Sequence, residues 1–221
     1  MNVFDIIGPV MVGPSSSHTA GAVRIAAVTR KLLGEDVKHA VIKLHGSFAS
    51  TYKGHGTDRA IIGGLLGYKL DNPAIRESLK HAGDVGLEYS FEPADLGDVH
   101  PNTVLIEATG VSGKKIKVMG CSVGGGRIII KRIDNFQVEF TGEYFTLVIE
   151  HMDKPGVIGA VTSVLGQNLI NIAEMRDYRS YRGGSAVMII ETDQEICKSL
   201  IEQIRNLPDV YSVVGIEALE I

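Results

Sequence analysis

The last third of the chain alternates short β-rich apolar runs with helical patterns, and this order constrains the fold more than any other feature. Apolar residues recur at helical spacing over residues 157–166 and 194–207, and Pro208 stops the second pattern. Runs rich in β-branched residues precede, separate and follow these helices, at residues 145–150, 170–176, 185–192 and 210–219. The predicted order is βαββαβ, which is typical of the split-βαβ motif of ferredoxin-like domains.

The longer N-terminal part has a mixed α/β pattern. Helices are predicted over residues 19–33 and, with interruptions by glycine, over residues 48–68. Two later β-rich runs flank the Val-Gly-Gly-Gly at 123–126 and indicate a hairpin. The sequence thus predicts an α+β chain, with a mixed α/β domain over residues 1–143 and a ferredoxin-like domain over 144–221.

Composition and charge exclude several classes of protein. The 221 residues include 44% hydrophobic and 22% charged residues, which is typical of a folded chain rather than a disordered one. The net charge of −4 argues against nucleic acid as a partner, because phosphate binding needs a basic surface. Two cysteines cannot form a disulfide framework, and no apolar run approaches the roughly 20 residues that span a membrane. With no basic region before an apolar stretch at its start, the chain is expected to be cytoplasmic, without membrane contact.

The segment Gly-Pro-Ser-Ser-Ser-His-Thr at residues 13–19 is the first candidate site. It places hydroxyl groups and a histidine where a helix is predicted to begin, and the backbone N–H groups there favour a carboxylate or phosphate. A histidine can also move a proton near neutral pH. The alternative is an ordinary serine N-cap with surplus polar residues. The catalytic candidates are Ser15, Ser16, Ser17, His18 and Thr19.

A second polar segment, Leu-His-Gly-Ser-Phe-Ala-Ser-Thr-Tyr-Lys-Gly-His-Gly-Thr-Asp, covers residues 44–58. It leads from the end of a predicted strand into a helix, which is where α/β domains bind ligands. The alternative is a solvated helix start with flexible glycines. The candidates for substrate binding are His45, Ser47 and His55. The chain has no His-x-x-x-His pair and no Cys-x-x-Cys, so no metal site is predicted in the chain itself.

The turn His-Met-Asp-Lys-Pro-Gly at residues 151–156 joins a predicted strand to a helix. Such a turn can form a small pocket for an anion or an amino acid at the helix start. The alternative is plain turn chemistry, since Asp, Pro and Gly favour turns without a ligand. The candidates for effector binding are Asp153, Pro155 and Gly156, together with Asn168 and Asn171 beyond the helix.

These segments together resemble the β subunit of bacterial iron–sulfur-dependent L-serine dehydratase. The resemblance covers essentially the whole chain, and its specific parts are the motifs at residues 13–26 and 45–58, with a hairpin that contains Cys-Ser-Val-Gly-Gly-Gly. The motif Asp-Lys-Pro-Gly-Val-Ile-Gly at 153–159 is generic to ACT domains, amino-acid-binding regulatory modules of βαββαβ order. The N-terminal part is similar to the allosteric substrate-binding domain of some phosphoglycerate dehydrogenases.

The resemblance implies that L-serine is converted to pyruvate and ammonia without pyridoxal phosphate. It implies a [4Fe–4S] cluster in a partner α subunit, where an open iron acts as a Lewis acid on the serine hydroxyl. This chain has only two cysteines, which are too few to bind the cluster. That number agrees with a β subunit that holds no cluster itself and is inactive without the α subunit. The resemblance also places the loop at 13–19 in the active site of the α subunit.

Two hypotheses remain open at this point. The chain is either an enzyme subunit that contributes substrate contacts, or a non-catalytic regulatory subunit that senses serine or another amino acid. The role of His18 is also open, since imidazole can hold a carboxylate or carry a proton. The edge strands of the βαββαβ domain favour a homodimer in either case.

Overall fold

The computed structural model describes residues 11–219, which form two compact units. The first unit ends at Asp134 and the second runs from Asn135 to Leu219. The domain boundary between residues 143 and 144 stays a prediction. The expected absence of a targeting segment concerns residues 1–10, which lie outside the described residues.

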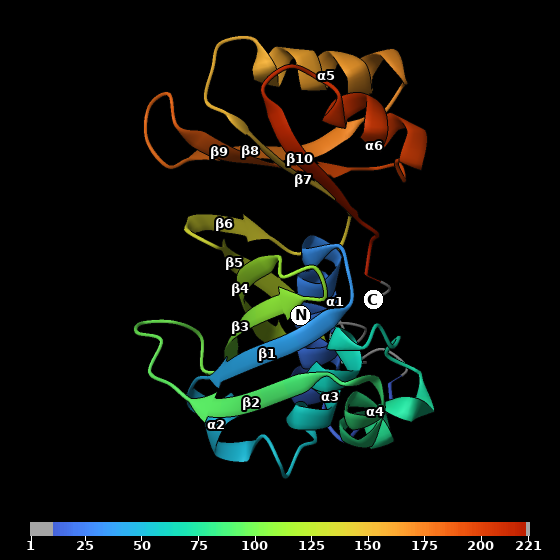
Figure 1. Ribbon diagram of the computed structural model, residues 1–221, viewed down its shortest axis with the longest axis vertical. Coiled ribbons are helices and arrows are strands. Elements are labelled where there is room, and N and C mark those ends of the chain that lie inside the picture. Colours follow the sequence, from blue (N-terminus) through green and yellow to red (C-terminus); the bar gives the residue numbers. More distant parts are fainter. Residues whose placement is uncertain (1–10, 220–221) are drawn as a thin grey trace. The chain divides into compact units, whose positions relative to one another are not determined.

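The first unit is a mixed α/β structure with one six-stranded sheet (Figure 1). The strand order is β2-β1-β3-β4-β5-β6, in which β1 and β2 are parallel and the pairs from β1 to β5 are antiparallel. Its helices and strands are η2 (Ser16–Ala20), α1 (Gly21–Leu33), β1 (Val37–Leu44), α2 (Gly46–Thr51), α3 (Thr57–Leu65), η3 (Pro73–Glu77), α4 (Ser78–Val85), β2 (Glu88–Pro93), β3 (Thr103–Gly110), β4 (Lys115–Gly124) and β5 (Arg127–Ile133). The last strand of this sheet, β6 (Phe136–Phe140), comes after Asp134 and so belongs to the second unit by its residues. Strands β4 and β5 form the predicted hairpin. Within residues 11–219, no helix is long and apolar enough to cross a membrane.

Helix α1 is the centre of this unit. It packs on β3, β4 and β5 on one side and on α3 on the other. Small and branched apolar residues therefore occur nearly all around the helix, and even Arg24 and Thr29 are buried. The last turn ends at Gly34, which is left-handed with φ 79°, the usual conformation of a glycine that caps a helix.

Gly64 lets α3 approach α1 closely. A Cβ atom at this position would lie 2.4 Å from the Val23 carbonyl oxygen and 2.7 Å from the Ala26 Cβ. Both atoms belong to the fixed body of α1, so neither can move aside cheaply. The glycine content of this part of the chain thus reflects close packing of backbones as well as turns.

The predicted helix over residues 48–68 is wrong as a single element. The structure has two helices there, α2 and α3, separated by a turn at residues 52–56. The break occurs because Gly56, at the start of α3, has a left-handed backbone with φ 68°. A right-handed helix does not continue through such a residue. The break brings His55 back towards the start of α1.

The second unit is a four-stranded antiparallel sheet with two helices on one face (Figure 1). The strand order is β10-β7-β9-β8, which is the arrangement expected for βαββαβ and confirms the predicted fold class. Its core joins the inner faces of the strands to the buried faces of both helices, for example Ile149, Val161 and Ile204. The elements are β7 (Phe145–Met152), α5 (Val157–Gln167), β8 (Ile172–Arg179), β9 (Ser185–Thr192), α6 (Lys198–Arg205) and β10 (Val210–Ile216).

Glu191 is a buried carboxyl group on β9. Only 6% of the residue is exposed, and its Oε1 atom has no hydrogen-bond partner. Burial raises the pKa of Glu191, and the nearby carboxylates of Glu174 and Glu143 raise it further, while the backbone at Thr141 and Gly142 partly offsets this. The ionised form of Glu191 therefore destabilises the folded chain.

Replacing Glu191 with glutamine should stabilise the protein at neutral pH. The folded pKa lies above the unfolded value of about 4.3, so stability falls as pH rises through this window and stays reduced above it. We expect Glu191→Gln to raise the Tm by a few degrees at pH 7, with a gain that disappears below about pH 4. Thermal unfolding between pH 4 and 8 measures this, with the exposed Glu195→Gln as control. An equal gain at every pH would contradict the titration argument.

Candidate functional site

The first predicted segment forms a short turn that leads into α1. Residues Ser16–Ala20 adopt a single π-helical turn, η2, a feature that is often found at functional sites. Ser15 caps this turn, because its Oγ accepts a hydrogen bond from the His18 backbone N–H at 3.2 Å. Ser16, Ser17 and His18 are half-buried. The serine N-cap, which was the alternative to a functional site, is therefore present. The same turn also holds His18 at a defined position.

The imidazole of His18 joins the two predicted segments. Its Nε2 lies 3.1 Å from Ser47 Oγ on α2, and its Nδ1 lies 3.4 Å from Ser15 Oγ. The His18 ring packs against the His55 ring at 4.7 Å between centroids and against the edge of Phe48 at 5.3 Å. The structure thus brings together Ser15 and His18 of the first segment with Ser47 and His55 of the second, and the two segments are far apart in the sequence.

His18 is held in its neutral form. Burial makes the largest contribution to lowering the pKa of His18, and the charge of His55 lowers it further. A backbone hydrogen bond at Ser47 raises this pKa by a smaller amount. A neutral imidazole has one N–H donor and one lone pair. At neutral pH His18 can therefore accept a proton or a hydrogen bond through one ring nitrogen while it donates through the other.

Several buried polar atoms around this turn lack hydrogen-bond partners. They are His55 Nδ1, Thr57 Oγ1 and Ser122 Oγ, and Thr57 and Ser122 are fully buried. Thr19 Oγ1 donates to the His55 carbonyl at 3.3 Å and so connects η2 to the turn before α3. Buried polar groups in proteins rarely lack a hydrogen-bond partner. A functional role is one explanation for the three unpaired groups at this turn.

Thr57 and Ser122 were not among the residues that the sequence singled out. Thr57 belongs to the same His-Gly-Thr-Asp run as His55, so its place in that motif was the available signal. Ser122 lies beside the start of α1, where a Cβ on Gly21 would be 2.2 Å from its Oγ. Only the packing of α1 on β4 reveals this position, and the spacing of residues in the sequence does not.

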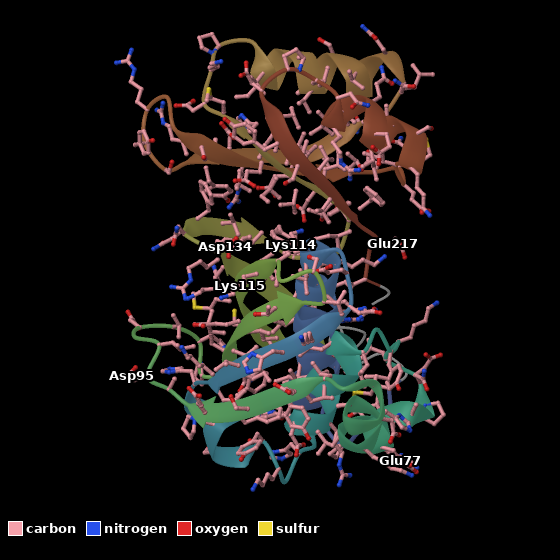
Figure 2. The ribbon with its side chains drawn as sticks, in the orientation of Figure 1. Glu77, Asp95, Lys114, Lys115, Asp134 and Glu217 are labelled. Carbon is pink, nitrogen blue, oxygen red and sulfur yellow. The ribbon has the colours of Figure 1, made fainter. Side chains whose placement is uncertain are left out.

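His45 makes contacts of its own, separate from those of His18. Its Nδ1 accepts a hydrogen bond from the Leu96 backbone N–H at 3.2 Å, and Asp95 Oδ1 lies 3.9 Å away. A shallow, open pocket of about 360 Å³ is lined here by His45, Gly46, Ala49, Pro93, Ala94 and Asp95. Figure 2 shows Asp95 on the loop beyond β2.

The effector candidates of the second unit lie at opposite ends of α5. Asp153, Pro155 and Gly156 precede the helix, whereas Asn168 and Asn171 follow it, and its 11 residues span roughly 16 Å. One copy of the chain therefore does not bring the two groups together in one pocket.

Each of the polar effector candidates also has a contact within the unit. Asp153 Oδ2 accepts a hydrogen bond from the Gly183 backbone N–H at 2.9 Å, which contributes most to lowering the pKa of Asp153. Asn168 Nδ2 donates to the Val164 carbonyl at 2.9 Å, and Asn171 Nδ2 donates to Asp193 Oδ2 at 2.6 Å. The Asp153 contact fixes the loop before α5, and the asparagine contacts fix the chain after it.

The described part of the chain does not offer ligands for an iron–sulfur cluster. Cys121 is buried in β4 of the first unit, and Cys197 is exposed before α6 in the second. Among residues 11–219, no three His, Cys, Asp or Glu side chains are grouped so that they could hold a metal ion. A cluster needs three or four such ligands close together.

Comparisons with known proteins identify two family models and several similar chains. The family model of the serine dehydratase beta chain matches residues 2–88, and that of the ACT domain matches residues 145–209. The "Probable L-serine dehydratase, beta chain" of Bacillus subtilis (strain 168) is 41% identical over 215 residues, which cover 97% of each chain. The "L-serine dehydratase, beta chain" of Peptoniphilus asaccharolyticus is 40% identical over 200 residues, 90% of each chain.

A different enzyme also contains a similar region. A D-3-phosphoglycerate dehydrogenase of Bacillus subtilis (strain 168) is 28% identical over 195 residues. The match covers 86% of this chain but 36% of the dehydrogenase. Both units of the chain thus have counterparts in a longer protein with another activity.

Proposed function

Because this chain belongs to the family of L-serine dehydratase beta chains, we propose that it is the β subunit of a heteromeric L-serine ammonia-lyase in the cytoplasm. The reaction removes the α-proton and the β-hydroxyl of L-serine as water. The resulting aminoacrylate rearranges to an imine, which takes up water and gives pyruvate and ammonia. In this proposal the [4Fe–4S] cluster belongs to the α subunit, since the residues described here do not fit it, and this chain is inactive alone.

The observation that carries the proposal is the convergence of His18, Ser47 and His55 beside the η2 turn. Ser15, Ser16, Ser17 and Thr19 supply hydroxyl groups at the start of this turn, where a substrate carboxylate is favoured. His18 is neutral and within reach of the same place, so it can accept a proton. His45 is assigned to substrate binding with less support, because its partners lie around a different pocket.

Anaerobic co-expression with the α subunit tests the proposal. We expect serine-dependent pyruvate formation from the pair and none from this chain alone. The same assay with Ser17→Ala should show reduced turnover, whereas His39→Ala, at an exposed position on β1, should leave it unchanged. Full turnover by the isolated chain, or an inactive pair that retains its cluster, would rule the proposal out.

A regulatory module is the second candidate function. The similarity to part of a D-3-phosphoglycerate dehydrogenase favours it, because a region shared by enzymes with different activities is a natural place for a common ligand. In this case the substitutions at 15–19 leave maximal turnover intact and change only the response to an added amino acid. Rate measurements with and without added serine analogues distinguish the two functions.

The second unit should form a homodimer. Its sheet has two edge strands, β10 and β8. The unit also has exposed apolar side chains at Leu169, in the turn after α5, and at Tyr211 on β10, which are 87% and 50% exposed. A dimer would also allow Asp153, Pro155 and Gly156 of one copy to form an effector pocket with Asn168 and Asn171 of the other. Light scattering of the full chain should give twice the 23.8 kDa of one copy. A monomer at micromolar concentration would contradict this.

A further inference from the structure

We propose that His151 is a positively charged positioning residue, which joins Asp177 on β8 to the loop at residues 153–156 and so fixes that loop. All of these residues belong to the second unit. The charge of His151 stands by itself, whereas its effect on an amino acid that binds the loop rests on the proposed regulatory function.

His151 is a buried histidine near the end of β7. Only 1% of the residue is exposed, so its ring nitrogens find their partners inside the protein. Nδ1 lies 2.8 Å from the Met152 carbonyl oxygen, and Nε2 lies 2.9 Å from Asp177 Oδ1. Both distances lie in the normal range for a hydrogen bond.

Neither oxygen atom beside the ring has a hydrogen to donate. A backbone carbonyl only accepts, and so does an ionised carboxylate. A neutral imidazole has one N–H group and would turn a lone pair towards one of these two oxygens inside the protein. The hydrogen between Nε2 and Oδ1 resides on the ring, because a free carboxyl group loses its proton near pH 4 and a free imidazolium only near about pH 6.5. His151 is therefore an imidazolium ion that donates from both nitrogens.

The contact of His151 with Asp177 crosses the sheet. His151 lies opposite Ala186 on β9, and Ala186 lies opposite Arg179 on β8. Asp177 is two residues from Arg179, so these four side chains share one face of the sheet. Ala186 has only a methyl group, which leaves room for the imidazole to reach over β9. The pair thus joins β7 to β8, two strands that are not neighbours in the sheet.

The second ring contact lies where the loop begins. The Met152 carbonyl that accepts the His151 Nδ1–H also accepts the Lys154 backbone N–H at 2.8 Å. The intervening Asp153 donates its backbone N–H to the Gly184 carbonyl at 2.8 Å, in the turn between β8 and β9. His151 therefore fixes the carbonyl about which the loop bends, and the loop is bonded in turn to the end of β8.

The charged groups near His151 are compatible with a positive ring. They are Asp177 and Arg179 on β8, Asp153 and Lys154 in the loop, and Asp209 before β10. Arg179 and Lys154 are each paired with a carboxylate, at 3.5 Å and 2.8 Å. The Gly183 backbone N–H makes the largest contribution to lowering the pKa of Asp153, Arg179 contributes after it, and the charge of His151 adds to both, while burial partly offsets them. Helix α5, which follows the loop, contains no charged residue.

Nitrogen NMR of the full chain tests the charge of His151. We expect both ring nitrogens to carry hydrogen at pH 7.5, where a free imidazole is largely neutral. Asp177→Asn should leave one hydrogen on the ring, because a neutral amide can donate to Nε2 and needs no additional proton. Glu195→Gln, which changes an exposed acid of the same unit, is the control and should leave the ring doubly protonated. A singly protonated His151 in the wild-type chain overturns the inference.

Backbone relaxation of residues 153–156 tests the positioning role in the same samples. The loop should be ordered in the wild-type chain and in Asp177→Asn, since both keep the contact across the sheet. Asp177→Ala removes that contact, and the order parameters of the loop should fall below about 0.6. Asp177→Ala also leaves a buried charge without a partner, which strongly destabilises a fold.

A pH series provides a second measurement that does not depend on the stability of Asp177→Ala. In the wild-type chain the loop should lose order at the pH where the ring loses its second hydrogen, and Asp177→Asn should show no such change. A loop that stays ordered after the ring becomes neutral overturns the positioning role.

Calorimetric titration with L-serine connects the loop to regulation. Asp177→Ala should weaken binding by at least about 5-fold, the lower end for coupled sites, and Asp177→Asn should stay within about twofold of the wild-type chain. Equal affinity in all three chains overturns the link between His151 and the bound amino acid. A wild-type chain that binds no serine contradicts the regulatory function and leaves the charge of His151 standing.

Discussion

Replacing His18 with alanine should lower kcat of the α–β enzyme by about 10²–10⁴-fold, the range that a positioned general base contributes. The neutral His18 ring, held between Ser15 and Ser47, is the proton acceptor that this loop supplies. KM should change little, because the serine hydroxyls and the N–H groups of η2 remain available for the carboxylate. The Tm of the isolated chain should remain within a few degrees, since the side chain is only half-buried.

Steady-state kinetics and thermal unfolding of the same preparation measure both effects. His39→Ala is the matched control, because His39 is an exposed histidine on β1. A rise in KM with kcat retained would assign His18 to anchoring the carboxylate. If both constants stay within about twofold, the segment is an ordinary helix cap, and the regulatory function becomes the better account.

Gly64→Ala should strongly destabilise the first unit. The new Cβ would lie 2.4 Å from the Val23 carbonyl oxygen, so α1 and α3 would have to separate. Overpacking of this kind costs about 1–3 kcal/mol, and here the obstacle is backbone, which places the cost at the upper end. For a chain of this size, about 3 kcal/mol lowers the Tm by roughly 6–12 °C.

Gly83→Ala on α4 is the control for this prediction. Gly83 is also a helical glycine, but a Cβ there meets nothing within 4 Å. Its replacement should stabilise the chain by up to about 1 kcal/mol through helix propensity. Thermal unfolding of the two variants should therefore shift in opposite directions, and similar shifts would mean that the contact of α3 with α1 is not tight.

The order of elements in the second unit could be predicted from the sequence because each element carries its own signal. Period-2 and helical patterns are local, and Pro208 marks the end of a helix within a few residues. No strand was predicted at β6, whose five residues lie just before the predicted boundary between residues 143 and 144. Local patterns therefore predicted the fold class, but they missed one short strand.

The candidate site was only half predictable. Both motifs stood out by composition, but the contact of His18 with Ser47 joins residues that are 29 positions apart. The approach of His55 to the same ring depends on the break at Gly56, which has no signature in the spacing of apolar residues. Thr57 shows the same limit, since only the three-dimensional structure reveals that its hydroxyl is buried without a partner.

The position of β1 inside the sheet has a consequence for how the chain is made on the ribosome. Both neighbours of β1 come later in the sequence, β2 at Glu88–Pro93 and β3 at Thr103–Gly110. The elements that cover helix α1, namely α3 and β3 to β5, are likewise synthesised after it. At about 5–20 residues per second, its apolar faces stay uncovered for on the order of 5–20 s of synthesis. During this time the exposed apolar surface of the nascent chain can bind chaperones. A product that ends before β3 lacks the strands that cover β1 and α1, so it cannot form the folded site.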